Sequence, residues 1–65
     1  MTPPITATER RVLLLRANGL TLKAVAAEMG MHKQTVSAIS RRIRDKLDVE
    51  TELEAMRIVF GWRLP

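Results

Sequence analysis

The sequence predicts a small all-α domain of four helices, and three observations lead to that prediction. Apolar residues recur at spacings of three and four in four separate segments. Turn signals, chiefly glycine, separate these segments, and no segment alternates apolar and polar residues as a half-buried strand does. The length of 65 residues limits the chain to one domain.

A short N-terminal arm, residues 1–5, precedes the first expected helix, because its two prolines oppose a helix start. Thr6 and Glu9 have the spacing of a capping box, in which each side chain accepts the other residue's backbone amide. The helix should therefore begin after Thr6 and run to about Ala17. Gly19 follows, where a left-handed residue is favoured. Residues 6–65 are expected to form the single domain.

The second and third expected helices are joined by a turn of about three residues. Leu22–Met29 follow the N-cap candidate Thr21, and Gly30 ends this helix. The third helix should run from about residue 33 to residue 47. Its apolar stripe consists of Val36, Ile39, Ile43 and Leu47.

The fourth expected helix opens with a second capping box, formed by Thr51 and Glu54. It follows a break at residues 48–50 and should stop near Gly61. Its expected apolar stripe consists of Leu53, Met56, Val59 and Phe60.

Charge and composition favour a nucleic-acid partner. The net charge is +4 and the pI is about 10.8. Residues 1–47 hold nine basic and three acidic side chains, whereas residues 48–65 hold two and four. This imbalance suggests a face for a polyanion, although a solvated basic surface would also produce it.

Several other classes of protein are excluded by what the chain lacks. It has no cysteine, no tyrosine, no glycine-rich phosphate loop and no apolar run near the ~20 residues of a membrane span. We therefore expect no enzymatic activity, no cofactor, no metal and no membrane contact. The expected compartment is the cytoplasm.

The second and third helices together have the properties of a helix-turn-helix. Small residues on the second helix allow close approach, Gly30 permits the turn, and the third helix is apolar on one side only. A recognition helix in a DNA major groove needs short side chains near its start and arginines one turn later. An amphipathic helix whose arginines are only solvated is the alternative. The polar side contains Gln34, Ser37, Ala38, Arg41, Arg42 and Asp45.

From about residue 5 to residue 64, the chain resembles the LuxR/GerE-type helix-turn-helix DNA-binding domain of bacterial transcription regulators. The matching segments occur in the family's order and without a gap. They are Ile5-Thr6-x-x-Glu9, Val12-Leu13, Gly19-Leu20-Thr21-x-Lys23-x-Val25-Ala26, Met29-Gly30-Met31, Lys33-x-Thr35-Val36, Ile43-x-x-Lys46-Leu47 and Glu54-Ala55-Met56-Arg57.

The resemblance implies that the third helix reads DNA and that the fourth forms a dimer contact. The family's base-reading places fall on Ser37, Ala38 and Arg41. Its phosphate contacts fall on Lys23, Lys33, Gln34, Thr35 and Arg42. For the dimer contact we select Met56, Val59, Phe60 and Trp62, with packing inside their own domain as the alternative for Met56 and Trp62.

Arg41 is the strongest candidate for a base contact, because arginine paired with guanine is the commonest specific contact. An ion pair with Asp45, one turn later, is the alternative. Lys23 is either a phosphate contact or a solvated lysine. The single histidine, His32, is expected beside the third helix near phosphate, and not in catalysis.

Three departures from the family pattern bear on the structure. Leu14 and Arg16 are swapped against the usual polar and apolar order, which implies a rotated first helix or a Leu14 exposed for a partner. Asp48 stands where the family often has glycine, and Ser37 replaces a basic or long polar residue. The acidic residues between 48 and 54 would repel DNA, so the start of the fourth helix is expected to face away from it.

The sequence therefore predicts a sequence-specific double-stranded DNA-binding transcription regulator. We expect it to stand alone without a sensor domain and to bind an inverted-repeat operator as a homodimer. The alternative is an interaction protein that binds a full-length regulator or RNA polymerase and modifies its activity. The basic side of the third helix favours the first reading, and the short Ser37 and Ala38 side chains favour the second.

Overall fold

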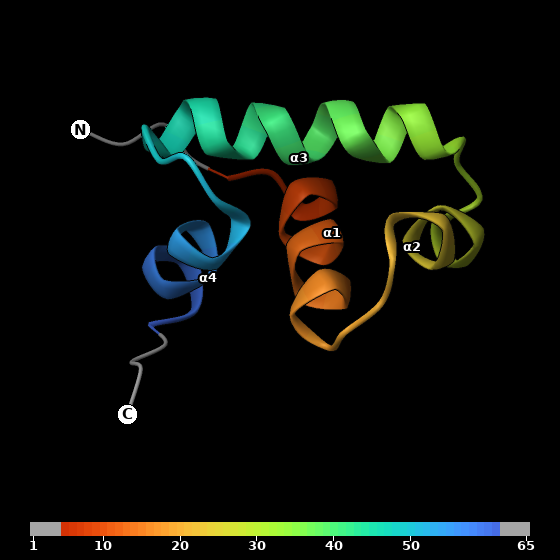
Figure 1. The fold of residues 1–65 in the computed structure, drawn as a ribbon, viewed down its shortest axis with the longest axis horizontal. Helices are drawn as coiled ribbons and strands as arrows, with labels where there is room; N and C mark the ends of the chain where they lie inside the picture. The colour runs from red at the N-terminus through yellow and green to blue at the C-terminus, as the bar shows by residue number, and fades with distance from the viewer. Residues whose placement is uncertain (1–4, 62–65) are drawn as a thin grey trace.

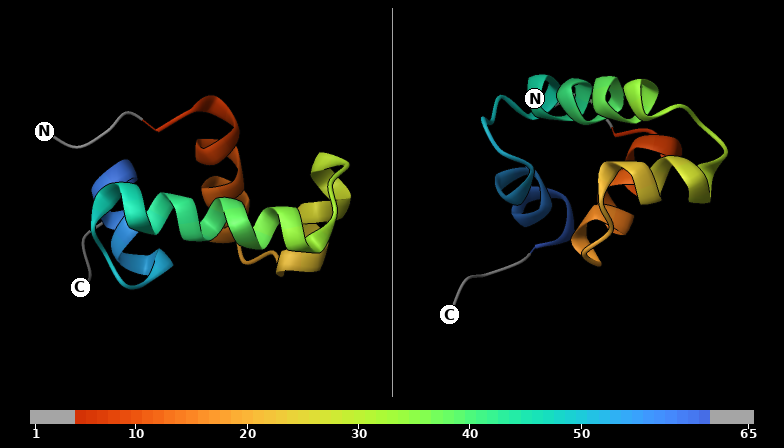
Figure 2. Two further views of the ribbon diagram at one scale, coloured as in Figure 1. Left: turned by 90° about the horizontal axis from the view of Figure 1, so that it is seen from above. Right: turned by 45° about the vertical axis from the view of Figure 1, so that its right-hand side comes forward.

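Four helices make up the part of the chain that the computed structural model describes, residues 5–61. They are α1 (Ala7–Ala17), α2 (Leu22–Met29), α3 (Lys33–Leu47) and α4 (Glu52–Phe60). The longest of them, α3, lies across one side of the other three (Figures 1 and 2). The all-α four-helix prediction is confirmed, and the expected helix boundaries hold to within a residue or two.

Both predicted capping boxes form. The Thr6 hydroxyl accepts the amide of Glu9 at 3.1 Å, and the Glu9 carboxylate accepts the amide of Thr6 at 2.9 Å. Thr51 and Glu54 repeat this exchange at 3.2 and 3.4 Å. Two orphan amides are thus satisfied at the start of α1 and two at the start of α4, which fixes where these helices begin.

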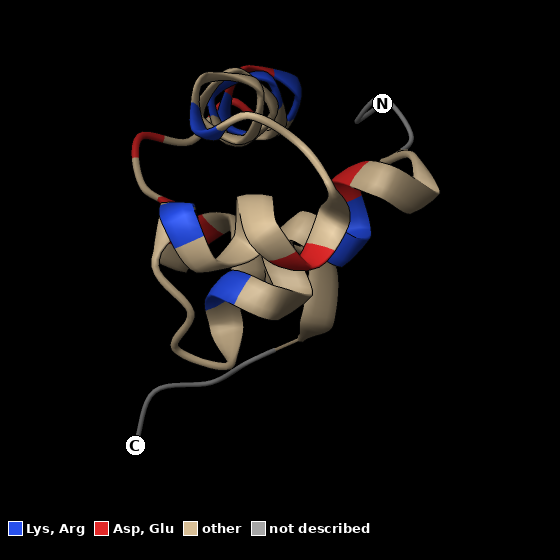
Figure 3. Ribbon diagram, turned by 90° about the vertical axis from the view of Figure 1, so that its right-hand side faces the viewer, with Lys and Arg blue, Asp and Glu red and all other residues tan. Residues whose placement is uncertain are grey.

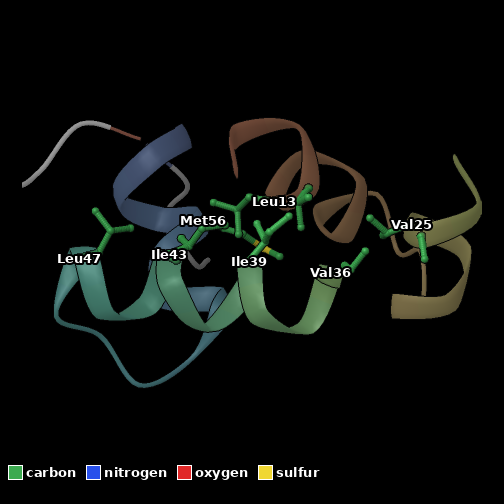
Figure 4. Close-up of a cluster of buried hydrophobic side chains, with 10 residues drawn as sticks. Leu13, Val25, Val36, Ile39, Ile43, Leu47 and Met56 are labelled. Carbon is green, nitrogen blue, oxygen red and sulfur yellow. The ribbon is translucent and has the colours of Figure 1, made fainter. Parts of the chain in front are cut away.

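The core lies between α3 and the other helices. Figure 4 shows Val36, Ile39, Ile43 and Leu47 along one side of α3, pointing towards side chains of α1, α2 and α4. All four are at most 9% exposed, as the spacing of the stripe predicts. The other core residues are Val12, Leu13, Val25, Ala26, Ala55 and Met56. One side of α3 is therefore committed to folding, which leaves its opposite side free.

The turn between α2 and α3 depends on Gly30, whose φ of +64° lies in the left-handed region that a side chain disfavours. The amide of Met31 returns to the carbonyl of Ala26 at 2.9 Å and closes the end of α2. His32 then takes an extended conformation and precedes α3 without capping it through its side chain. The three-residue turn is thus confirmed.

A nearly buried ion pair joins α1 to the far end of α3. Glu9 is only 2% exposed, and its Oε1 accepts a hydrogen bond from Lys46 Nζ at 2.8 Å. The same oxygen accepts the Thr6 amide. The carboxylate that caps α1 therefore also fixes α1 against the C-terminal turn of α3, and removing Lys46 would leave the buried Glu9 carboxylate without this opposite charge.

The residue that ends α3 has a left-handed conformation, although it is not glycine. Asp48 has φ of +55° and ψ of +48°. An L-residue in this region costs about 1–2 kcal/mol, less for Asp than for most types. Its negative charge also lies at the negative end of the helix dipole.

We expect Asp48→Gly to stabilise the domain by about 1 kcal/mol, because glycine removes both the conformational cost and the unfavourable charge. In a domain of this size, that gain raises the melting temperature by roughly 4–8 °C. Thermal unfolding followed by circular dichroism measures it. Asp48→Asn is the matched control, because it removes the charge alone and should recover only part of the gain. A lower melting temperature for Asp48→Gly would contradict this account.

Candidate nucleic-acid interface

The side of α3 that faces away from the core carries all three predicted base-reading residues. Ser37, Ala38 and Arg41 are exposed, as the helical wheel requires for positions opposite the buried stripe. The predicted phosphate residues of this helix, Lys33, Gln34, Thr35 and Arg42, are exposed as well. Figure 3 looks along α3 and marks its basic positions in blue, with the other helices lying below it.

The start of α2 adds a further polar region to the helix-turn-helix. Lys23 is exposed in the first turn of α2. The hydroxyl of Thr21 accepts the amide of Ala24 at 3.1 Å, so Thr21 is the N-cap of α2, as predicted. The remaining amides of this helix start favour an anion, which is the reason for assigning Lys23 to a phosphate.

Arg41 is not held by the acidic residue one turn later. Within residues 5–61, no ion pair joins Arg41 to Asp45, so the structure gives no support to that alternative. The two side chains line a shallow hollow together with Arg44, Val49 and Glu50. The Arg41 guanidinium therefore has no acidic partner that a DNA base would need to displace.

The same hollow contains one of the acidic residues that precede α4. Glu52 and Glu54 are engaged by Arg16 and by the α4 capping box, respectively. Glu50, in contrast, lines the hollow beside Arg41.

The predicted dimer residues of α4 have different environments. Met56 is 7% exposed and belongs to the core, which is the alternative that the sequence left open. Val59 and Phe60 are half-buried and pack against that core. Trp62 lies outside the described residues. Of the four predicted dimer residues, Val59 and Phe60 are therefore the two that lie within residues 5–61 and are partly exposed.

Two apolar residues that the dimer assignment missed are the most exposed on α4. Leu53 is 45% exposed and Ile58 is 54% exposed. Leu53 was expected in the core stripe, but Ala55 occupies that position instead, with no exposed surface. Glu52, which precedes Leu53, meets Arg16 of α1 on the side of α4 that also buries Ala55 and Met56. Sequence spacing alone gave no sign of this arrangement.

The Leu14–Arg16 swap is explained by that ion pair. Leu14 is 44% exposed, while the neighbouring Val12 and Leu13 lie in the core. Arg16 lies against α4, with Nη2 at 2.8 Å from Glu52 Oε1. The first helix therefore keeps Val12 and Leu13 in the core. Arg16 stands where the family usually has an apolar residue, and the Glu52 carboxylate pairs with it.

Two carboxylates have perturbed protonation equilibria. Burial by itself raises the pKa of Glu9, but hydrogen bonds from Lys46 and the Thr6 amide lower it below its ordinary value. Burial likewise raises the pKa of Glu52, and hydrogen bonds from Arg16 and Ser40, with the charges of Arg16 and Arg44, lower it. Both residues join helices, so neither is placed for acid–base chemistry.

Within residues 5–61, His, Asp and Glu side chains do not gather in groups that could hold a metal ion. No helix in this part of the chain is both long and apolar enough to cross a bilayer. The exposed side of α3 and the start of α2 thus remain as the candidate site.

Comparison with known proteins agrees with this geometry. Residues 3–59 match the family of bacterial regulatory proteins named after LuxR. The chain belongs to the LuxR family. It is 37% identical over 60 residues to the transcriptional regulatory protein UhpA of Escherichia coli (strain K12) and, to the same degree, to UhpA of Salmonella typhimurium.

These matches cover 91% of this chain but only 31% of each relative. The chain therefore spans about a third of the length of the regulators it resembles. No solved structure matches it. The LuxR-family assignment confirms the resemblance found in the sequence, and the described helices are those of a helix-turn-helix domain.

Because Glu9 and Glu52 have lowered pKa values when folded, this LuxR-family domain should lose stability in acid. Unfolded carboxylates take up protons from about pH 5 downwards, before the folded ones do, so protons favour the unfolded state. The melting temperature should be nearly constant from about pH 5.5 to 7 and fall progressively below about pH 5.

Thermal unfolding across this pH range checks the effect. Glu52→Gln should lower the melting temperature at pH 7 and flatten its fall in acid, because one of the two titrating groups is gone. Glu50→Gln removes an exposed carboxylate from the same segment and serves as the control. An acid profile of Glu52→Gln that parallels the wild type would show that the ion pair does not cause the pH dependence.

Proposed function

We propose that this domain binds double-stranded DNA sequence-specifically and regulates transcription, as a homodimer on an inverted repeat in the bacterial cytoplasm. The observation that carries the proposal is the division of α3. Its core side is fully used in folding, while every residue assigned to DNA on it is exposed on the other side. No catalytic step is part of this function, because its chemistry is recognition alone.

In the proposed complex, α3 enters the major groove and α2 crosses the backbone. Ser37 and Ala38 are short and lie where the helix approaches the bases closely, and Arg41 reaches a guanine one turn later. Lys33, Gln34, Thr35 and Arg42 hold phosphates on both sides of the groove. Lys23 holds a further phosphate at the start of α2.

Two copies are proposed to associate through α4. Leu53 and Ile58 give this helix two large apolar side chains in solvent, and Val59 and Phe60 continue the apolar surface to the core. Exposed apolar groups of this kind gain about 25 cal/mol for each Å² that a partner removes from water. Pairing of α4 would place two α3 helices in successive major grooves.

Selection from a random double-stranded DNA library should enrich an inverted repeat with the wild-type protein. Arg41→Ala should weaken binding to that site by about 1–3 kcal/mol and relax the selected base at one position in each half-site. Titration of the selected site and of random DNA measures both effects.

Arg42→Ala is the matched comparison, because it removes the same charge from the same helix. It should weaken binding to both DNAs similarly and reduce the salt dependence by about one phosphate contact. Equal losses on both DNAs for Arg41→Ala would reduce Arg41 to a phosphate contact. A folded wild-type protein that enriches no sequence would overturn DNA reading and favour the interaction protein, for which Leu14 supplies an exposed apolar contact.

Ile58→Asp should abolish association without unfolding the domain, because Ile58 is the most exposed large apolar residue within residues 5–61 and the substitution places charge at the proposed interface. Sedimentation analysis should show monomers. In DNA titrations, the variant should keep its affinity for a single half-site but no longer prefer the inverted repeat. Arg57→Gln, at an exposed polar position on the same helix, is the control. Unchanged association of Ile58→Asp would place the dimer contact elsewhere.

A further inference from the structure

The Arg16 guanidinium joins three parts of the molecule. From α1, its Nε donates to both carboxylate oxygens of Glu52 at 3.1 and 3.2 Å, and its Nη2 donates to Oε1 at 2.8 Å. Its Nη1 donates to the backbone carbonyl of Leu20 at 2.8 Å. A single side chain therefore holds the first turn of α4 and the loop that leads into α2.

The geometry of this contact fixes orientation as well as distance. An arginine that meets both oxygens of a carboxylate holds the two planar groups in one relative direction, unlike a lysine. The side chains are partly buried, with 28% of Arg16 and 19% of Glu52 exposed. Water therefore competes for these hydrogen bonds less than it does at the surface.

The hydrogen bonds of Glu52 join the start of α4 to α1. Ser40 and Arg44 of α3, together with Arg16, lower the pKa of the Glu52 carboxyl. By chain connection alone, α4 is joined to α3 through four residues, the first of which is the left-handed Asp48.

The contact to Leu20 extends the connection to the DNA-binding side. Leu20 immediately precedes Thr21, the N-cap of α2, and Lys23 lies in the first turn that follows. Arg16 thereby links the proposed dimer helix to the end of α2 that is assigned to a phosphate. The Glu9–Lys46 pair joins α1 to α3.

We propose that Arg16, held by Glu52, is a positioning residue that fixes α4 relative to the helix-turn-helix and so sets the half-site spacing that the dimer accepts. This inference rests on the proposed function, because spacing has meaning only for a dimer on DNA. In the proposed dimer, the orientation of α4 relative to the helix-turn-helix of the same copy determines how that copy's recognition helix meets the DNA. Loss of the Arg16–Glu52 contact loosens that angle without touching any DNA-reading side chain.

The test compares one half-site with pairs of half-sites whose separation changes by single base pairs. Arg16→Gln should bind the single half-site within about twofold of the control Arg11→Gln, which removes the same charge from an exposed position of α1. The preference of Arg16→Gln for the best half-site separation over the neighbouring separations should fall by about threefold or more, because a loosened dimer fits several separations.

A reversed pair separates positioning from general loss of structure. Glu52→Arg alone should lose the spacing preference, and adding Arg16→Glu should restore part of it by reforming an α1–α4 ion pair. This comparison also applies if Arg16→Gln fails to fold, which circular dichroism reveals. No recovery in a folded double variant overturns the proposal.

The remaining outcomes separate this inference from the proposed function. A wild-type protein that binds no DNA overturns both. Wild-type binding to single half-sites without any preferred separation leaves DNA reading intact and overturns the positioning role. An unchanged spacing preference in Arg16→Gln, or equal losses on the single half-site and on every pair, also overturns it.

Discussion

The fold depends above all on the burial of one side of α3 against the other three helices. In a chain of 65 residues without a cysteine, this packing is the main source of stability, and no disulfide can add to it. Because the stripe contains only one side of α3, the same helix can support the core and present a polar surface. Folding therefore uses one side of α3, and the proposed DNA contacts use the opposite side.

Much of this arrangement follows from local sequence rules. The two capping boxes, the glycine after α2 and the spacing of the α3 stripe each predict a feature that the structure contains. These signals are reliable because each acts within a few residues and is satisfied by the backbone nearby. The exposed positions of α3 follow from the same spacing, which is why the candidate DNA-reading surface could be assigned before the structure was known.

The features that the sequence did not predict all depend on contacts between distant residues. Leu53 is exposed and Ala55 is buried on α4, where Glu52 meets Arg16, 36 residues earlier in the chain. Glu50 lies beside Arg41 because of the path that the chain takes after Asp48. Helical periodicity predicts the width of an apolar stripe. It does not predict which side of the helix is buried when a charged residue at the edge of the stripe pairs with a distant residue.

The free side of α3 has a consequence for how such domains diversify. Ser37, Ala38 and Arg41 lie outside the core, so replacing them should cost little folding stability. Arg16 and Glu52 are constrained in the opposite way, because a change at one leaves a partly buried charge at the other. In the proposed complex, single substitutions would therefore alter the preferred bases, whereas a new arrangement of the two copies would require paired changes within each.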